Sequence, residues 1–316
     1  MLSPGVSVVI PVYKSALILP ALLARLEAVL LNCAVHFEVV LVCDGGAGDE
    51  CWKLVRDRAG RCSWLRGLAL AKNYGQHAAT LAGIRVACYD RIVTLDDDLQ
   101  HPPESIPQLL GRLTDDVDVV YGQPINAMGG PFRAFLSRSF RNTISCLTDI
   151  SHTSGMTAFR AVRTSVRERF PGRRLPLASV DLLLALVTRR VAFVPVHFDP
   201  RLAGRSNYNL LKLTSMAFAW VLAANPKVRW WTICISACWL VLVILMLARL
   251  IAVLVSGSAI LTESNFWGGF VVWIVALQLG LLGFFGCFTR QIPTDSSGFP
   301  HAIVEDKINF PGQNVS

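Results

Sequence analysis

Charged residues are scarce in this chain, which argues against an ordinary soluble domain. Only 16% of the 316 residues are Asp, Glu, Lys or Arg, whereas 53% are hydrophobic. Soluble globular domains usually carry about 25% charged residues. A composition this apolar is typical of chains that bury part of their length in lipid, so it directs attention to membrane-spanning segments.

The cysteines lack metal-binding spacing. None of the nine forms a Cys-x-x-Cys pair, the spacing typical of zinc sites and thioredoxin-like redox centres. The start of the chain lacks the basic segment and small-residue cleavage site of a signal peptide, so we expect a cytosolic domain with reduced thiols. The net charge is +8, but no platform of interleaved basic and aromatic residues indicates nucleic-acid binding. The charge instead favours contact with anionic membrane lipid.

Two long apolar runs are present, at residues 230–255 and 266–288. Each exceeds the roughly 20 residues that a helix needs to cross a bilayer. Aromatic residues stand at their ends, Lys and Arg flank the pair, and the link between them contains neither Lys nor Arg. This pattern predicts two transmembrane helices with both termini in the cytoplasm. A pair of buried core helices is the alternative, although such helices are usually shorter and amphipathic.

Apolar β-branched runs alternate with helical stretches in the first 125 residues. We expect strands at 6–12, 37–43, 65–71, 91–95 and 117–121, helices at 17–31, 49–59 and 75–87, and a further helix beginning at Pro102 and Pro103. This alternation predicts a doubly wound α/β domain. Ligands bind such domains at the carboxyl ends of the strands. Pro11, Tyr13, Asp44 and the run 96–98 all fall there, so we expect them to form one site.

After residue 125 the pattern changes to longer amphipathic stretches. Residues 131–147 present one face of Phe, Leu and Ile and carry several Arg, and residues 208–224 read as a mostly apolar helix directly before the first long run. Both patterns fit helices that lie on a membrane surface. Packing on the sheet is an equal alternative for the first.

Three consecutive aspartates, Asp96 to Asp98, end the fourth predicted strand. Adjacent carboxylates repel one another unless a cation neutralises them, and Mg²⁺ binds carboxylate oxygens together with substrate phosphates. Side chains alternate along an extended segment, so Asp96, Asp98 and Gln100 can face one side. We expect these three residues to bind Mg²⁺ or Mn²⁺. A solvated acidic turn is the alternative.

The sequence around the aspartates resembles a known family. Residues 73–77 read Asn-Tyr-Gly-Gln-His, and residues 96–104 read Asp-Asp-Asp-Leu-Gln-His-Pro-Pro-Glu. Both stretches are similar to motifs of the family 2 glycosyltransferases with the GT-A fold, in the branch that uses polyprenyl phosphates. That branch includes dolichol-phosphate mannose synthases and bacterial undecaprenyl-phosphate aminoarabinose and glucose transferases. The resemblance extends over nearly the whole chain, including both long apolar runs.

The resemblance implies an order of domains along the chain. We expect a GT-A, Rossmann-like nucleotide-sugar domain over 1–207, a juxtamembrane amphipathic helix over 208–229, transmembrane helices over 230–255 and 266–288, and a cytoplasmic tail over 289–316. The protein would then be a multi-pass protein of the inner membrane with its catalytic domain in the cytoplasm. Membrane lipid and further copies of the same chain are the expected partners.

For the donor, the resemblance implies a nucleotide-diphosphate sugar, with UDP favoured as the nucleotide. Pro11 and Tyr13 would flank the base, and Asp44 would contact the base or the ribose. Asp98 would be catalytic, because it holds the metal against the donor diphosphate. The predicted nucleotide-sugar-binding residues are Pro11, Tyr13, Asp44, Gln76, Asp96 and Asp97.

For the acceptor, residues 154–160 and 201–208 resemble the family's acceptor segment and its Arg-x-x-Gly-x-Ser-x-Tyr motif. The resemblance implies that Arg160, Arg201 and Ser206 bind the lipid phosphate and that the two arginines are catalytic, since a guanidinium matches phosphate oxygens. The implied reaction is inverting, metal-dependent sugar transfer to a polyprenyl phosphate, with undecaprenyl phosphate favoured. A phosphate monoester is already anionic at neutral pH, so no strong general base is required.

Some positions depart from the family pattern. Lys14 and Ser15 stand where relatives usually carry Asn-Glu, Asp97 stands where they carry Ala, and Cys43 stands where they often carry Asp. Ala158 stands where some relatives carry an acidic residue. The departures at Lys14, Cys43 and Ala158 leave open a catalytically inactive, glycosyltransferase-like scaffold in a sugar-lipid pathway. A processive polysaccharide synthase is a third hypothesis, but the chain lacks the Gln-x-x-Arg-Trp segment and the additional spans of such enzymes.

Overall fold

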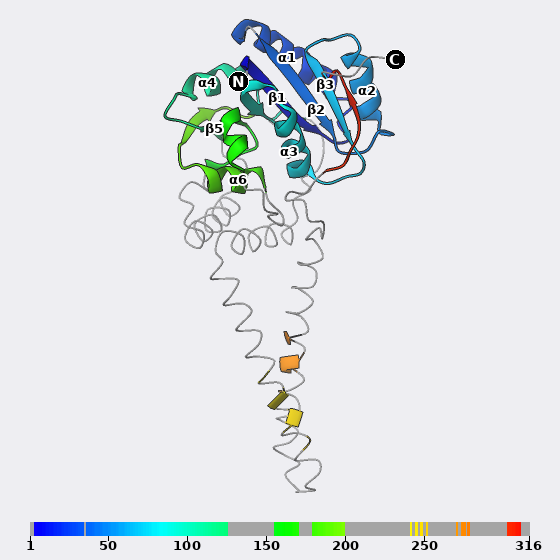
Figure 1. Ribbon diagram of the computed structural model, residues 1–316, viewed down its shortest axis with the longest axis vertical. Helices are drawn as coiled ribbons and strands as arrows, with labels where there is room; N and C mark the ends of the chain where they lie inside the picture. Colours follow the sequence, from blue (N-terminus) through cyan, green and yellow to red (C-terminus); the bar gives the residue numbers. More distant parts are fainter. Residues whose placement is uncertain are drawn as a thin grey trace. The chain divides into compact units, whose positions relative to one another are not determined.

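Two compact units make up the chain in the computed structural model. One comprises Met1–Tyr208 with Ser296–Ser316, and the other comprises Asn209–Asp295. The residues that the structure describes are 3–34, 36–125, 155–170, 179–199 and 302–310, with isolated positions between 241 and 278 (Figure 1). All strands among these residues belong to the first unit.

A mixed sheet of eight strands forms the centre of the first unit. The strands are β1 (Ser3–Val12), β2 (Phe37–Cys43), β3 (Leu65–Leu70), β4 (Tyr89–Thr94), β5 (Val119–Pro124), β6 (Arg160–Arg163), β7 (Val191–Val196) and β8 (Val304–Ile308). Their order is β7-β5-β6-β4-β1-β2-β3-β8. The strands β4, β1, β2 and β3 pair in parallel, whereas β6 and β8 run antiparallel to their neighbours. The predicted α/β class is therefore confirmed, with a mixed rather than a purely parallel sheet.

The helices cover both faces of the sheet. They are α1 (Leu19–Cys33), α2 (Glu50–Ala59), α3 (Gln76–Val86), α4 (Ile106–Arg112), α6 (Val180–Val187) and the short 3₁₀ helices η1 (Pro103–Ser105) and η3 (Thr164–Arg169). All the strands and helices predicted in the first 125 residues are present, with small shifts at their ends. The helix expected at Pro102 begins with the 3₁₀ turn η1, whose first residue is Pro103. A proline suits the first helical turn, where no N–H donor is needed.

Burial on both faces explains why the strand sequences are almost uniformly apolar. In β1, Val8 and Ile10 pack in a core cluster with residues of α1, α2 and α4, whereas Val9 packs in a second cluster with residues of α3 and α6. Successive side chains of a strand point to opposite faces, so both sets have to be apolar. Full burial of one such side chain stabilises the fold by about 1.5–3 kcal/mol.

Helix α3 packs unusually close to the sheet. A Cβ atom built on Gly83 would stand 2.3 Å from Cγ1 of Val9 and 3.0 Å from Cγ2 of Val42. Real Cβ atoms do not approach other carbons to 2.3 Å, so only glycine allows this distance. The close packing brings the first turn of α3, which begins at Gln76, to the carboxyl edge of the sheet.

Among the described residues, five elements have no counterpart in the sequence prediction: β6, η3, α6, β7 and β8. The strand β6 has only four residues, with Arg160 and Arg163 at its ends, and so shows no run of apolar side chains. Helix α6 is also short, but the sequence offered one signal, a serine directly before the helix, which is a preferred N-cap residue. In the structure the Ser179 hydroxyl accepts a hydrogen bond from the Leu182 N–H at 3.1 Å.

The strand β8 comes from the C-terminal tail and pairs antiparallel with β3. Figure 1 shows it in red beside β3 and α2, although well over 200 residues separate it from them in the chain. The Ala71 N–H donates to the Ile303 carbonyl at 2.8 Å, and Arg56 pairs with Asp306 at 2.7 Å. The tail therefore completes the sheet of the first unit.

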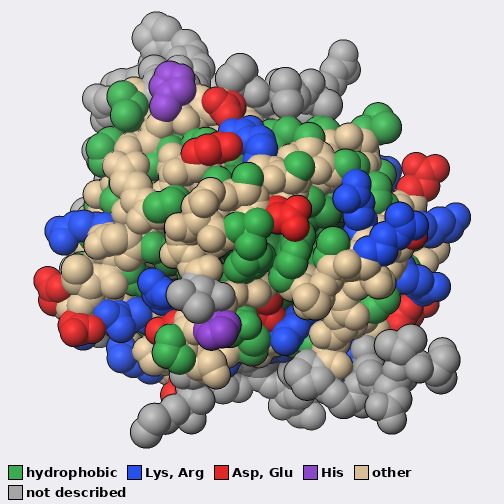
Figure 2. Space-filling model, turned by 90° about the horizontal axis from the view of Figure 1, so that it is seen from above, with side chains coloured by type: hydrophobic (Ala, Val, Ile, Leu, Met, Phe, Trp, Pro, Cys, Tyr) green, Lys and Arg blue, Asp and Glu red, His purple; other side chains and the backbone are tan. Residues whose placement is uncertain are grey.

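Charges of both signs are interspersed on the face of the protein drawn in Figure 2. Several of the described charges form largely exposed ion pairs, among them Arg56–Asp306 and Arg61–Asp57. Exposed pairs of this kind contribute about 0–1 kcal/mol. The excess of basic residues in the chain is therefore not gathered into one patch on this face.

The predicted membrane segments lie mostly beyond the part of the chain that the structure describes. This applies to residues 131–147, 208–229, 230–255 and 266–288. Among the described residues, no helix combines the length and the apolar character that crossing a bilayer requires. The isolated described positions in the two long runs are helical, and several of their large apolar side chains are exposed, including Ile244, Leu245 and Trp273.

Candidate active site

The carboxyl ends of β2, β1 and β4 lie side by side at one edge of the sheet. Val12 is in register with Cys43, and the Asp44 N–H donates to the Val12 carbonyl at 2.9 Å. The loop that carries residues 96–98 follows β4, the neighbour of β1 on its other side. The sheet therefore brings together the strand-end residues that the sequence singles out.

Of the two residues predicted to flank the base, one is covered and one is accessible. Pro11 is buried within β1, whereas Tyr13, directly after this strand, is 40% exposed. The Lys14 ammonium lies 5.1 Å from the centre of the Tyr13 ring, within the range of a cation–π contact. The exposed ring of Tyr13 is the surface on which a planar base could stack.

The Asp44 carboxylate binds backbone groups of the turn before α3. Its Oδ1 accepts the Tyr74 N–H at 2.7 Å and its Oδ2 accepts the Gly75 N–H at 2.8 Å. Burial raises the pKa of Asp44, and these two N–H groups act in the opposite direction. Gly75 has φ of +91°, which glycine adopts without steric cost. Asp44 thus holds the start of α3, and its contact with a nucleotide stays a prediction.

The loop after β4 directs its carboxylates to separate partners. Gln76 donates its side-chain N–H to Oδ1 of Asp96, while Oδ1 of Asp98 accepts the Gln100 N–H at 3.1 Å. The Asp96 N–H in turn donates to Nδ1 of His101 at 3.0 Å. Gln76 therefore contacts the acidic loop directly, and the His101 side chain binds the backbone of the same loop.

The middle aspartate binds the end of β1. Oδ2 of Asp97 accepts the Tyr13 N–H at 3.0 Å and the Ser15 hydroxyl at 2.5 Å. Burial raises the pKa of Asp97; the bonds from Ser15 and Tyr13 lower it, and the charges of Asp96 and Asp98 raise it. The Asp97 carboxylate thus binds donors of the protein itself, and the sequence did not predict these two partners.

The donor set of the loop fits a metal that also binds substrate. Among the described residues, no group of three or more His, Cys, Asp or Glu is arranged to hold an ion. Because Asp97 is bonded to the turn after β1, the carboxylates of Asp96 and Asp98 and the amide oxygen of Gln100 are the candidate ligands of the loop. Mg²⁺ is commonly held by one or two carboxylates together with substrate phosphates and water, so these residues fit a metal that arrives with its nucleotide.

Arg160 is buried in an ion pair. Its residue surface is 2% exposed, its guanidinium donates to Asp181, and its Nε donates to the Thr94 hydroxyl at 3.0 Å. Thr94 donates in turn to the Ala158 carbonyl at 2.6 Å. These bonds tie the end of β4 to the predicted acceptor segment. They support a positioning role for Arg160, and its direct contact with a lipid phosphate stays a prediction.

Two more titratable groups complete the surroundings of Arg160. The Tyr121 hydroxyl donates to Oδ1 of Asp181 at 3.2 Å, and burial raises the pKa of Tyr121 well above its ordinary value. Burial lowers the pKa of His77, with Asp181 and Arg160 acting in opposite directions. Burial also acts to lower the pKa of Arg160, but Asp181 and Tyr121 outweigh it. The lowered pKa favours a neutral His77 imidazole at neutral pH.

The segment after β7 lies against the acidic loop. The Asp199 N–H donates to the Gln100 carbonyl at 2.9 Å. Arg201 and Ser206 follow Asp199 closely in the chain but lie outside the described residues. Asp199, the last described residue before the predicted phosphate-binding motif, therefore contacts the predicted metal loop.

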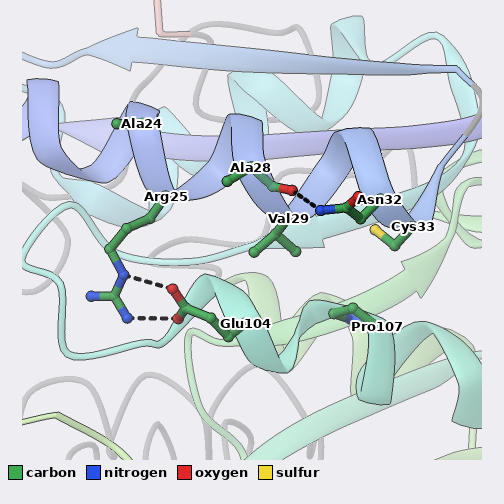
Figure 3. Close-up of a pocket in the computed structure, with 8 residues that line it drawn as sticks. All are labelled: Ala24, Arg25, Ala28, Val29, Asn32, Cys33, Glu104 and Pro107. Atoms are coloured by element: carbon green, nitrogen blue, oxygen red, sulfur yellow. Dashed lines mark hydrogen bonds and ion pairs between the residues drawn. The ribbon is translucent and has the colours of Figure 1, made fainter.

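A groove of about 670 Å³ lies between α1 and the helices η1 and α4 (Figure 3). Arg25 donates to both carboxylate oxygens of Glu104, at 2.8 and 2.6 Å, and its Nη2 lies 3.4 Å from Asp199. The groove contains none of the predicted site residues. The Glu104 of the acidic motif therefore has a structural partner, Arg25, which joins α1 to η1.

The residues that sequence reasoning missed are the partners of those it found: Ser15, Asp181 and His101. His101 was visible between Gln100 and Pro102, but it carried no assigned role. The structure stacks its ring on Phe159 with 5.4 Å between ring centres and places Phe198 edge-on at 4.9 Å. Asp181 had no local signal, because its partners are brought to it only by the sheet.

An acidic loop and an exposed aromatic ring at the strand ends place the candidate site where the open-sheet class of α/β domains binds ligands. A comparison with family models gives the family within this class. The model described as Glycosyl transferase family 2 matches residues 7–170, a span that contains the second part of β1, all of β2 to β6 and the acidic loop. The chain belongs to glycosyl transferase family 2, and the family predicted from its motifs is confirmed.

Similar curated proteins narrow the comparison. The chain is 34% identical over 214 residues to the undecaprenyl-phosphate 4-deoxy-4-formamido-L-arabinose transferase of Aeromonas hydrophila. It is 35% identical over 214 residues to a protein of the same name from Pseudomonas aeruginosa. Each match covers 67% of this chain, and they cover 65% and 63% of those relatives. The chain thus spans just under two thirds of the length of the curated relatives it matches.

A solved structure supports the fold. Glucosyl-3-phosphoglycerate synthase from Mycobacterium tuberculosis superposes with a TM-score of 0.50 at 15% identity, over 71% of this chain and 80% of that chain. An identity this low shows a shared fold and nothing about the substrate. The expected GT-A fold of the first unit is therefore supported from both sequence and structure.

Proposed function

We propose that this protein transfers a sugar from a nucleotide-diphosphate sugar to a polyprenyl phosphate, with inversion at the anomeric carbon. The observation that carries the proposal is that Tyr13, Asp44 and the aspartates 96–98 meet at one sheet edge in a family 2 glycosyltransferase chain. The names of the two curated relatives support undecaprenyl phosphate as the acceptor. Their sugar, 4-deoxy-4-formamido-L-arabinose, is the first to test as the transferred group.

The donor binds across the ends of β1 and β4. The exposed Tyr13 ring stacks on the base, next to Pro11, and UDP is the favoured nucleotide. Asp96, Asp98 and Gln100 hold Mg²⁺ or Mn²⁺ against the diphosphate. When bound, the ion neutralises the negative charge that builds up on the departing diphosphate. Gln76 orients Asp96 through the side-chain hydrogen bond between them.

The acceptor phosphate approaches from the side of the segment after β7. Arg201 and Ser206 bind it; in support, Asp199, which precedes them in the chain, is bonded to Gln100 of the acidic loop. The phosphate is itself an anionic nucleophile, so the protein needs cations that align two anions rather than a strong base. Arg160 contributes by holding the backbone at Ala158 through Thr94.

A location at the cytoplasmic face of the inner membrane follows from the acceptor. Residues 230–255 and 266–288 are long enough to span the bilayer. The exposure of Ile244 (55%), Leu245 (60%) and Trp273 (65%) supports this assignment, because large apolar side chains are more stable in lipid than in water. The two curated relatives act on a lipid phosphate by name, which agrees with a membrane site.

The test is transfer of label into lipid. Full-length protein in nanodiscs is mixed with undecaprenyl phosphate, Mn²⁺ and radiolabelled UDP-sugars, and the organic extract is counted and analysed by mass spectrometry. We expect a labelled glycolipid with wild type and a loss of roughly a hundredfold or more with Asp98→Ala, since the metal supplies several kcal/mol. Asp115→Ala is the matched control, because its fully exposed side chain precedes β5 at the opposite edge of the sheet.

Two results would contradict the proposal. Transfer by Asp98→Ala at the wild-type rate would remove the metal assignment. Metal-dependent binding of UDP-sugars without any turnover, across a panel of sugars and polyprenyl phosphates, would favour the inactive scaffold instead.

A further inference from the structure

Asp97 connects two loops that the chain keeps far apart. Its Oδ2 accepts hydrogen bonds from the Tyr13 N–H at 3.0 Å and from the Ser15 hydroxyl at 2.5 Å. Both donors come from the turn after β1, whereas Asp97 lies in the loop after β4. A single carboxylate oxygen therefore ties the turn that presents the Tyr13 ring to the loop that presents Asp96 and Asp98.

Both of these loops contain a strained residue. Lys14 has φ of 57° and Leu99 has φ of 60°, and they are two of the three non-glycine residues with positive φ in the described part of the chain. Side chains with a Cβ rarely adopt this conformation, because Cβ approaches a carbonyl oxygen. The third, Asn309, belongs to a residue type that tolerates it. The left-handed turn at Lys14 brings the Tyr13 N–H and the Ser15 hydroxyl to the same oxygen, so the bonds to Asp97 offset the strain.

The two bonded side chains are also positions at which this chain departs from its family's pattern. Ser15 stands where relatives usually carry Glu, and Asp97 stands where they carry Ala. The structure places these two departures in direct contact.

We propose that Asp97 is a positioning residue that fixes the Tyr13 turn against the metal loop and is itself neither a metal ligand nor a nucleotide contact. The three adjacent aspartates then divide into two ligands, Asp96 and Asp98, and one anchor. Asp97 acts on the donor through Tyr13, because the ring can stack on a base held over the metal only while its turn is fixed. This consequence for the donor rests on the proposed function; the anchoring contact does not.

Hydrogen exchange tests the anchor without any substrate. Full-length protein in nanodiscs is compared by mass spectrometry over the peptide that covers residues 10–16. We expect Asp97→Ala to increase exchange in this peptide by about tenfold, since the Tyr13 N–H loses a charged acceptor. Asp97→Asn keeps an acceptor oxygen and is expected to stay close to wild type. Unchanged exchange in Asp97→Ala would overturn the proposal.

Ligand binding separates an anchor from a ligand. Binding of Mn²⁺ is followed by electron paramagnetic resonance, and binding of UDP in the presence of Mn²⁺ by calorimetry. We expect Asp97→Ala to bind Mn²⁺ as wild type does and to bind UDP about tenfold more weakly, whereas Asp98→Ala loses Mn²⁺. Loss of Mn²⁺ binding in Asp97→Ala to the same degree as in Asp98→Ala would overturn the proposal. Failure of wild type to bind UDP would contradict the proposed function and leave the exchange result standing.

A double-mutant cycle tests the partner. If Ser15 acts through Asp97, then Ser15→Ala combined with Asp97→Ala should weaken UDP binding no more than Asp97→Ala alone. Fully additive effects would overturn the assignment of Ser15 and Asp97 to one contact. Asp57→Ala, on the exposed surface of α2, is the matched control and should change neither exchange nor UDP binding.

Discussion

Arg160 shows how strongly surroundings decide the role of a residue. Judged from the sequence alone, Arg160 is an arginine near a Ser-Gly segment and is suited to binding phosphate. In the structure its side chain is 3% exposed and its guanidinium is paired with Asp181. Asp181 belongs to α6, on a different element from Arg160, and no sequence spacing relates the two. The sequence indicates that Arg160 suits an anionic partner, but only the fold shows that Asp181 is paired with it.

The ion pair between Arg160 and Asp181 leads to a prediction for stability. Asp181→Ala leaves a buried guanidinium without its carboxylate, so we expect the free energy of unfolding to fall by about 3–5 kcal/mol. Urea or thermal unfolding of the full-length protein measures it. Replacing both residues, as in Arg160→Met with Asp181→Leu, should cost less than the single change, because no unpaired charge remains.

The exposed pair Arg61–Asp57 provides the control for that experiment. Both of its side chains are more than half exposed, so Asp57→Ala should change the free energy of unfolding by less than about 1 kcal/mol. A loss in Asp181→Ala no larger than in this control would show that the buried pair does not stabilise the fold.

At the scale of elements, period and residue type predicted most of the N-terminal half. The runs of Val, Ile and Leu in β1 and β2 are apolar at every position because both faces of these strands are buried. The elements β6, α6 and β7 were not predicted. β6 has four residues and α6 has eight, and β7 contains a proline, Pro195, which by itself argues against a strand. Short elements are set by their neighbours more than by their own sequence, and β6 exists as a strand because β4 and β5 offer it partners on both sides.

Helix α3 gives a prediction at this scale. Gly83→Ala would force its new Cβ against Val9 and Val42, so we expect a loss of about 1–3 kcal/mol in the free energy of unfolding. Because the helix would be pushed away from β1 and β2, donor binding should weaken as well. Thermal unfolding and UDP calorimetry measure the two effects.

A glycine in another helix is the matched control for Gly83. A Cβ on Gly111 of α4 meets no atom within 4 Å. Gly111→Ala should therefore be neutral or stabilise the protein by up to about 1 kcal/mol, since alanine loses less backbone entropy than glycine in a helix. Equal losses at Gly83 and Gly111 would mean that close packing is not the cause.

At the scale of the whole chain, the first unit is built from both ends of the sequence. Residues 302–310 cover the outer edge of β3. Asn309 donates its side-chain N–H to the carbonyls of Ala59 and Leu65 at 2.5 and 2.9 Å. These bonds fasten the C-terminal strand to the turn between α2 and β3, so the unit depends on a segment that follows the second unit in the chain.

Asn309 gives the prediction at this scale. Asn309→Ala removes the bonds and places a Cβ residue other than asparagine at φ of 63°, so we expect a loss of about 1–3 kcal/mol. Asn309→Gly keeps the backbone conformation and should lose less. Faster hydrogen exchange in residues 65–70 reports the release of β8. The exposed Lys307→Ala is the control, and β3 protection that survives in Asn309→Ala would contradict the fastening role.

The sequence by itself determined the α/β class, the family, the strand ends that form the site and the residue types that suit a metal and a diphosphate. These depend on local periodicity and on short motifs, which can be recognised directly in the sequence. Tertiary structure alone decided the partner of each side chain. In the fold, Asp97 binds the turn after β1, Arg160 pairs with Asp181, and the C-terminal strand pairs with the edge of β3. The reason is that hydrogen bonds and ion pairs depend on distances in space, and the sheet brings into contact residues that the chain keeps far apart.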